Sequence, residues 1–213
     1  MPGSFELDPQ GRAVPGPTAA SPPARHARTG SGPTKGILLR RLAEGAAAGR
    51  ILELGTNTGM SGSYLATAPS CDTLVTIEGS PELAAIARDT LGRFTDRAEV
   101  RCAMFDEALD DLSSEALFDL AFLDGQHDGE AVRHYVGRLV QMLSSTGMVV
   151  LDDIYWSSSM NETWRTLVAD AGFEVTVDLG DLGVIFPGVG ARRAHHDFAR
   201  FVGRPRIPPR VGD

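Results

Sequence analysis

The stretch ILELGTNTG at residues 51–59 decides the fold. An apolar run of strand length ends in a turn that contains Gly55 and Gly59, and sequence with helical spacing follows. Glycines in such a turn let the backbone approach a ligand closely, beside the N-terminus of the next helix. The glycines do not have the G-x-G-x-x-G spacing of dinucleotide-binding turns, because Asn57 stands where the second glycine belongs. The stretch therefore predicts a ligand without a pyrophosphate.

The alternation of strand and helix continues on both sides of this turn. Five apolar segments are predicted strands, at residues 50–54, 73–77, 99–103, 118–123 and 147–151. Helical patterns separate them, and a helix over about 34–47 precedes the first strand. Two further strands, 173–179 and 182–187, flank Gly180-Asp181, a link that suits a type II′ hairpin. The pattern predicts an α/β fold with a doubly wound, mostly parallel, Rossmann-like sheet of seven strands that ends in an antiparallel hairpin.

Composition separates this region, residues 33–188, from two tails. Residues 1–32 are rich in Pro, Gly, Ala and Ser, which predicts a disordered or loosely packed N-terminal arm. Residues 189–213 form an Arg-rich C-terminal tail. The chain of 213 residues has 28 acidic and 20 basic residues and a formal net charge of −8. This balance disfavours nucleic acid as a partner, although the Arg-rich tail leaves RNA binding or a homo-oligomer contact open.

Cysteine usage and hydropathy bear on the compartment. Cys71 and Cys102 have no metal-ligand spacing and are predicted to be buried free thiols, as expected in a reducing compartment. No apolar run reaches the length of a transmembrane helix, and the N-terminus lacks the apolar core of a signal peptide. The sequence therefore predicts a cytoplasmic protein with no membrane partner.

Acidic residues at the ends of the first two strands point to a nucleoside ligand. Glu78 ends the second strand, where an acidic residue usually binds both ribose hydroxyls. Glu53 lies near the end of the first strand, where a carboxylate is costly unless it meets a donor or a cation. A nucleoside with a positive charge and no phosphate would suit both residues, and S-adenosylmethionine is such a ligand.

The segment ELGTNTG, with Glu78 one strand later, resembles the signature of class I S-adenosylmethionine-dependent methyltransferases. The resemblance extends from about residue 36 to residue 187. It implies that the glycine loop wraps the amino-acid part of the cofactor, that Glu78 holds the ribose and that later residues lie near the adenine. The cofactor-binding residues that it implies are Glu53, Gly55, Thr56, Asn57, Gly59, Ser61, Glu78, Gly79, Ser80, Phe105, Asp106 and Asp124.

A second polar group follows the fourth and fifth predicted strands. FLDGQH contributes Asp124 and His127, and VVLDD contributes Asp152 and Asp153. Three carboxylates at adjacent strand ends would repel one another strongly unless a cation lay among them. Carboxylate oxygens suit Mg²⁺, Mn²⁺ or Ca²⁺, and such an ion would bind and acidify a substrate hydroxyl. Histidine could then accept the proton at neutral pH.

This second group is similar to metal-dependent O-methyltransferases of the macrolide-sugar type and, more distantly, of the catechol type. The resemblance implies that Asp124, Asp152 and Asp153 ligate a divalent ion. It also implies that His127 is the general base, so that the catalytic residues are His127 and Asp124. One departure is Gly129, which stands where these relatives commonly carry tyrosine.

Simpler explanations for the second group stay open. Asp124 or Asp128 could cap the helix that begins near Gly129, Asp152 could be a cofactor contact, and Asp153 could be an exposed carboxylate.

We therefore expect an S-adenosylmethionine-dependent O-methyltransferase that acts on a hydroxyl of a small molecule, with Mg²⁺ as the first choice of ion. One alternative is a metal-independent methyltransferase of the same fold, directed at nitrogen, a carboxyl group or RNA. Another is a non-catalytic nucleoside-binding module. An NAD-linked oxidoreductase is disfavoured by Asn57.

Overall fold

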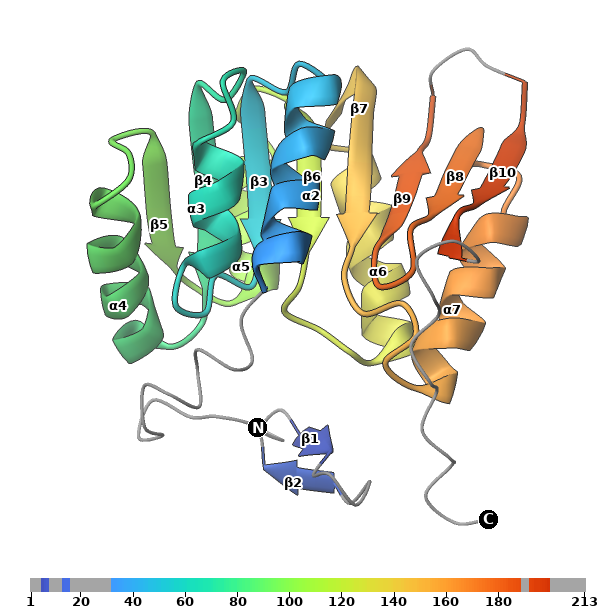
Figure 1. The fold of residues 1–213 in the computed structure, drawn as a ribbon, viewed down its shortest axis with the longest axis horizontal. Helices are drawn as coiled ribbons and strands as arrows, with labels where there is room; N and C mark the ends of the chain where they lie inside the picture. The colour runs from blue at the N-terminus through green and yellow to red at the C-terminus, as the bar shows by residue number, and fades with distance from the viewer. Residues whose placement is uncertain (1–4, 8–12, 16–31, 189–191, 200–213) are drawn as a thin grey trace.

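The seven predicted strands are present in one sheet, which has one additional strand. The computed structural model describes residues 5–7, 13–15, 32–188 and 192–199. The strands of its main sheet are β3 (Arg50–Leu54), β4 (Thr73–Glu78), β5 (Ala98–Cys102), β6 (Phe118–Leu123), β7 (Leu143–Leu151), β8 (Val175–Asp178), β9 (Gly183–Phe186) and β10 (Ala194–Asp197). They lie in the order β10-β8-β9-β7-β6-β3-β4-β5, and β9 is antiparallel to both its neighbours (Figure 1). A mostly parallel α/β sheet with a terminal antiparallel hairpin is thus confirmed.

The additional strand comes from the segment predicted as a tail. β10 pairs in parallel with β8, which makes the sheet eight-stranded instead of seven-stranded. Its sequence, AHHD, has no apolar run that would predict a strand, and its pairing depends on contacts with β8 such as the 2.9 Å hydrogen bond between His195 Nδ1 and Thr176 Oγ1. In the predicted N-terminal arm, β1 (Phe5–Leu7) and β2 (Ala13–Pro15) form a separate two-stranded antiparallel sheet. Apart from these and Gly32, the arm lies outside the described residues.

Helices cover both faces of the main sheet. They are α2 (Pro33–Gly45), α3 (Met60–Ala66), α4 (Pro81–Gly92), α5 (Phe105–Leu112), α6 (Gly129–Val140) and α7 (Ser158–Ala169). Helices α2, α3 and α4 lie side by side on one face, and α5, α6 and α7 cover the other (Figure 1). None of the helices in the described part of the chain is long and apolar enough to cross a membrane.

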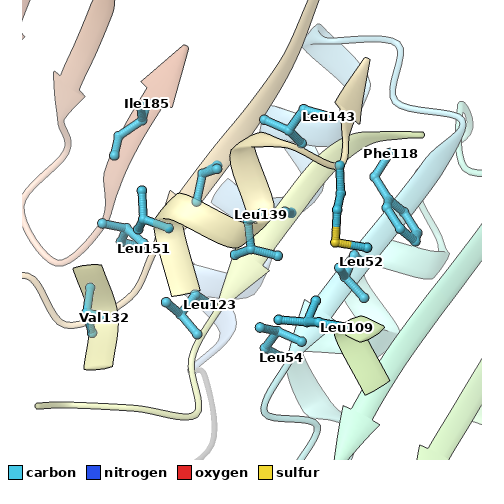
Figure 2. Packing of buried hydrophobic residues seen from close by; sticks show 14 of the residues in the cluster. Leu52, Leu54, Leu109, Phe118, Leu123, Val132, Leu139, Leu143, Leu151 and Ile185 are labelled. Carbon is cyan, nitrogen blue, oxygen red and sulfur yellow. The ribbon is translucent and has the colours of Figure 1, made fainter. Parts of the chain in front are cut away.

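Each face of the sheet has its own hydrophobic core. Successive residues of a strand point to opposite faces, so Leu52 and Leu54 pack with α5, α6 and α7, while Ile51 packs with α2 and α3. Figure 2 shows the first of these clusters, in which Leu54, Leu123 and Leu151 come from neighbouring strands in register. Burying each such leucine contributes roughly 1.5–3 kcal/mol. The strand ends are therefore held by a packed sheet. Cys71 is buried as predicted, whereas Cys102 is exposed, contrary to the prediction, because it ends the edge strand β5.

One helix is shorter than its spacing predicts. Leu143 continues the apolar repeat of α6, but the helix ends at Val140 and Leu143 begins β7. In the sheet Leu143 pairs with Phe118, and the register between β6 and β7 shifts just after this pair. At the end of α6, the pairing of Leu143 with the neighbouring strand β6 therefore outweighs the helical spacing of the apolar residues.

Candidate active site

Four neighbouring strands bring the predicted site residues to one edge of the sheet. β4, β3, β6 and β7 are consecutive in the sheet, and their carboxyl ends point the same way (Figure 1). The amide of Asp124 donates to Leu54 O at 2.9 Å, and the amide of Asp152 donates to Leu123 O at 3.0 Å. These bonds extend the ladders by one residue, and so they place both aspartates on the rim beside the turn that follows β3.

The loop of residues 55–59 depends on glycine. Gly55 and Gly59 have φ values of 103° and 84°, in the left-handed region that favours glycine. A Cβ on Gly55 would lie 2.6 Å from the backbone nitrogen of Gly125, in the turn after β6. The loop therefore packs backbone against backbone, and a side chain at Gly55 would force the two turns apart.

Glu78 holds this loop through backbone donors. Its Oε2 accepts from the amide of Asn57 at 2.8 Å, and its Oε1 accepts from the amide of Ser80 at 2.9 Å. Burial raises the pKa of Glu78, and these amides partly oppose the shift. Ser80 also caps α4, because its Oγ accepts from the amide of Leu83 at 3.4 Å. Gly79 lies between Glu78 and Ser80 in the sequence. We call residues 55–59 together with Glu78 the cradle.

A buried polar cluster lies under the cradle. Glu53 is completely buried, and its Oε2 accepts from Thr76 Oγ1 at 2.6 Å. Burial raises the pKa of Glu53 to about 7, although hydrogen bonds with the side chains of Ser61 and Thr76 oppose the shift. Thr56 Oγ1 lies 2.5 Å from Thr76 Oγ1. Among the described residues, neither Glu53 Oε1 nor Asn57 Oδ1 has a hydrogen-bond partner. Two unsatisfied acceptors next to the loop fit a ligand with several donors, since leaving them unpaired is costly.

Of the two predicted cofactor-binding residues after β5, Phe105 lies near the cradle and Asp106 lies on the protein surface. The ring of Phe105 packs against Gly125, where a Cβ would lie 2.3 Å from it, and meets Tyr135 edge-on at 5.4 Å between centroids. Asp106 is exposed and accepts from Arg138 Nη1 at 3.1 Å, with His134 Nε2 at 3.0 Å. A hydrogen bond with His134 lowers the pKa of Asp106. The geometry places Phe105 beside the cradle and pairs Asp106 with α6 instead.

The three carboxylates converge as the sequence predicts. We call Asp124, Asp152 and Asp153 the acidic centre. Asp124 and Asp152 share a hydrogen bond, and burial followed by repulsion from Asp152 raises the pKa of Asp124 well above its usual range. Burial and Asp153 also raise the pKa of Asp152. Asp153 has a φ of 53°, and its amide donates to Asp152 Oδ1 at 2.8 Å. Such convergence of like charges is the electrostatic condition that favours a bound cation.

His127 joins the acidic centre from the loop before α6. One ligand atom each from Asp124, His127 and Asp153 lie within 4.8 Å of one another. The imidazole stacks on Trp156 at 5.4 Å between centroids, and its Nδ1 has no hydrogen-bond partner among the described residues. The stacking holds the ring at the rim and leaves a nitrogen available for chemistry.

The capping explanation applies to Asp128 and not to Asp124. Asp128 Oδ1 accepts from the amides of Glu130 and Ala131 at 3.1 and 3.0 Å, which caps α6. Gly129 is buried where α6 meets α7, and a Cβ there would lie 2.3 Å from Thr163 Oγ1. A tyrosine at this position has no room, which accounts for the departure from the resembled family.

The sequence did not predict the role of Lys35. Its Nζ, in the first turn of α2, donates to Asp152 Oδ1 at 2.6 Å and to Asp153 Oδ1 at 3.3 Å. Burial disfavours its charge, but the carboxylates outweigh that effect and raise the pKa of Lys35. The partners lie 117 and 118 residues away in the chain. The only available sequence signal was that Lys35 is the single lysine among 20 basic residues.

Comparisons with known proteins bear on the family and the fold. Residues 52–154 match a protein-family profile described as "Methyltransferase domain". That segment contains the loop of the cradle, Glu78 and the acidic centre. Residues 52–154 thus form a methyltransferase domain, and the fold is that of S-adenosylmethionine-dependent methyltransferases. Comparison with curated protein sequences found no match.

Solved structures share the methyltransferase fold. Cofactor-bound Rv0187 from MTB is 24% identical with a TM-score of 0.67, over 79% of this chain and 84% of its own. The O-methyltransferase from Bacillus cereus in complex with SAH is 22% identical with a TM-score of 0.66, over 76% and 85%. TomG, an O-methyltransferase from Streptomyces achromogenes involved in tomaymycin synthesis and solved with SAM, is 20% identical with a TM-score of 0.65, over 78% and 88%. At these identities the likeness concerns the fold.

Proposed function

We propose that this methyltransferase transfers the methyl group of S-adenosylmethionine to a hydroxyl of a small molecule, with a divalent ion at the acidic centre and His127 as general base. One observation carries the proposal: the acidic centre lies directly against the cradle. A Cβ on Gly55 would lie 2.8 Å from the carbonyl carbon of Asp124. Two similar structures are of proteins described as O-methyltransferases, which supports the choice of oxygen.

The cradle's task is to bind and orient the donor. S-adenosylmethionine supplies a methyl group made electrophilic by its sulfonium. Glu78, already ordered by two amides, is placed to accept from the ribose hydroxyls, and the unpaired acceptors of Glu53 and Asn57 suit the ammonium of the amino-acid part. Because methyl transfer is an in-line displacement, positioning supplies much of the acceleration.

The acidic centre fits a hard divalent ion. Its donors are carboxylate oxygens with an imidazole beside them, and these are ligand types that Mg²⁺ and Mn²⁺ accept. A divalent ion there would supply Lewis acidity to an acceptor hydroxyl. His127 would hold the proton that the hydroxyl loses, and the Trp156 ring would keep the imidazole in place.

A metal-independent reaction is the second candidate, because Lys35 already supplies a positive charge to Asp152 and Asp153. In that case the ammonium would orient the acceptor by hydrogen bonding, and no ion would be needed.

Methyl transfer from labelled S-adenosylmethionine to a small-molecule metabolite extract, with product mass recorded, tests the proposal. We expect EDTA to abolish transfer, Mg²⁺ to restore it and Asp152→Ala to lose it, whereas Asp111→Ala, on the exposed face of α5, should behave as wild type. Full activity in EDTA would contradict the metal role and favour the second candidate. Binding of S-adenosylhomocysteine without transfer to any extract, or transfer to a tRNA pool instead, would contradict the small-molecule proposal.

A further inference from the structure

Lys35 occupies the acidic centre although nothing local favours a cation at its position. It lies in the first turn of α2, where the helix dipole disfavours positive charge, and α2 has no acidic residue in that turn. Its side chain is 20% exposed, and its partners within hydrogen-bond distance are Asp152 and Asp153. The ammonium is therefore held in place by Asp152 and Asp153, which are distant in the sequence, and not by residues of its own helix.

Lys35 and a divalent ion would need the same oxygens. Asp152 Oδ1 already accepts from Lys35 at 2.6 Å and from the amide of Asp153 at 2.8 Å. The mutually close ligand atoms in the structure belong to Asp124, His127 and Asp153, a set that leaves Asp152 out. While the Lys35 ammonium is in place, carboxylate oxygens of Asp152 and Asp153 that would bind the metal ion are already hydrogen-bonded to it.

Charge leads to the same conclusion. Three carboxylates and one ammonium leave up to two negative charges at the centre, yet an ammonium bonded to Asp152 would repel a divalent ion that takes the same carboxylate. Lysine has a long flexible stem, and its exposed fraction shows that a path to solvent exists. The ammonium can thus leave the carboxylates without a change in the sheet.

The geometry points to Lys35 as a resident counter-ion that the divalent ion must displace from Asp152 and Asp153, so that Lys35 sets the metal affinity of the centre. This inference rests on the proposed metal role. It makes the metal-bound and the ammonium-bound states of the centre mutually exclusive. It also predicts that metal entry releases the first turn of α2 from the rim.

Metal affinity gives the first test. Mn²⁺ binding to the full chain, measured by electron paramagnetic resonance of the free ion, should be at least about tenfold tighter in Lys35→Met than in wild type, a change that corresponds to about 1.4 kcal/mol. Arg40→Met is the matched control, because Arg40 lies on the same helix and pairs with Glu44. Its affinity should equal that of wild type. Equal or weaker binding by Lys35→Met would overturn the inference, since Lys35 would then coexist with the ion or organise its ligands.

The unique lysine permits a second test on the unmodified wild-type chain. The rate of acetylation at Lys35, followed by peptide mass spectrometry, should rise at least about fivefold when Mg²⁺ or Mn²⁺ binds, because the displaced side chain becomes exposed and leaves the carboxylates that favour its unreactive ammonium form. The N-terminal amine of the same molecule is the internal control. An unchanged rate at saturating metal would overturn the inference even if Lys35→Met failed to fold.

The outcomes separate this inference from the proposed function. Metal-dependent methylation with an unchanged Mn²⁺ affinity in Lys35→Met would leave the proposed function intact and overturn the displacement. Absence of Mn²⁺ binding in both proteins, with S-adenosylhomocysteine still bound, would overturn the displacement together with the metal role. Mn²⁺ binding by Lys35→Met and none by wild type would support displacement in its strongest form.

Discussion

The cradle and the acidic centre share one edge of the sheet but are built by different means. The cradle is made largely of backbone: glycines at positive φ, amides that donate to Glu78, and a turn packed against Gly125. The acidic centre is made of side chains that directly follow β6 and β7, together with a lysine from α2. Because the cradle is closely packed backbone, it has no room for an added side chain. The acidic centre consists of side chains, so we expect that it can exchange one cation for another. Substitutions in each half should therefore have different consequences.

The largest effect should follow from adding a side chain to the cradle. Gly55→Val places Cβ and two methyl groups where the backbone of Gly125 lies, at a φ that valine resists. We expect a loss of about 4 kcal/mol or more in the free energy of unfolding and no detectable binding of S-adenosylhomocysteine by calorimetry.

A matched glycine supplies the control for this variant. Gly137 lies in α6 with open space around its Cβ position, so Gly137→Ala should keep full binding and gain up to about 1 kcal/mol. If Gly55→Val bound the ligand normally, the cradle would not depend on close backbone packing.

In the acidic centre, removing the imidazole should affect the reaction and spare the fold. His127→Ala should lower the rate of methyl transfer by about 100-fold, because a positioned base is lost, while binding of S-adenosylhomocysteine stays unchanged. Added imidazole should restore part of the rate. His134→Ala, an exposed histidine on α6, is the control. A rate equal to wild type in His127→Ala would exclude it as the base.

The contrast also explains what the sequence could predict. Glycine spacing and the position of Glu78 at a strand end are local patterns, so ELGTNTG together with Glu78 was enough to predict the loop and its ligand class. The aspartates were predictable because parallel strands end at one edge. Lys35 and β10 were not, since both depend on partners distant in the chain and neither stands in a local pattern.

Under the cradle, the buried carboxyl group of Glu53 should make the stability of the protein depend on pH. Its pKa of about 7 in the folded, ligand-free protein lies above the usual 4.5, because burial disfavours the charged form. The stability that its protonated form contributes is full below about pH 4.5 and is lost as the pH rises towards 7. Wild type should thus lose about 2 kcal/mol relative to Glu53→Gln between about pH 5 and pH 7 in denaturant unfolding.

The matched control for Glu53 is an exposed glutamate. Glu107→Gln, at the start of α5, should keep a difference from wild type that does not change over the same pH range. A difference between Glu53→Gln and wild type that is equally constant would mean that Glu53 is not held in a low-dielectric site under the cradle.

The smallest effect should come from Asp128, the carboxylate closest in sequence to His127 and outside the acidic centre. Asp128→Ala removes the cap of α6 and should cost about 1 kcal/mol, which corresponds to a fall of roughly 2–4 °C in melting temperature. Asp128→Ser, which keeps an acceptor at the cap, should recover most of this loss. Both variants should bind Mn²⁺ and transfer methyl groups as wild type does, because the Asp128 carboxylate bonds to the amides of α6. A loss of metal affinity in Asp128→Ala, comparable to that in Asp124→Ala, would show that the acidic centre extends beyond the three strand-end carboxylates and that capping and metal binding draw on the same residue.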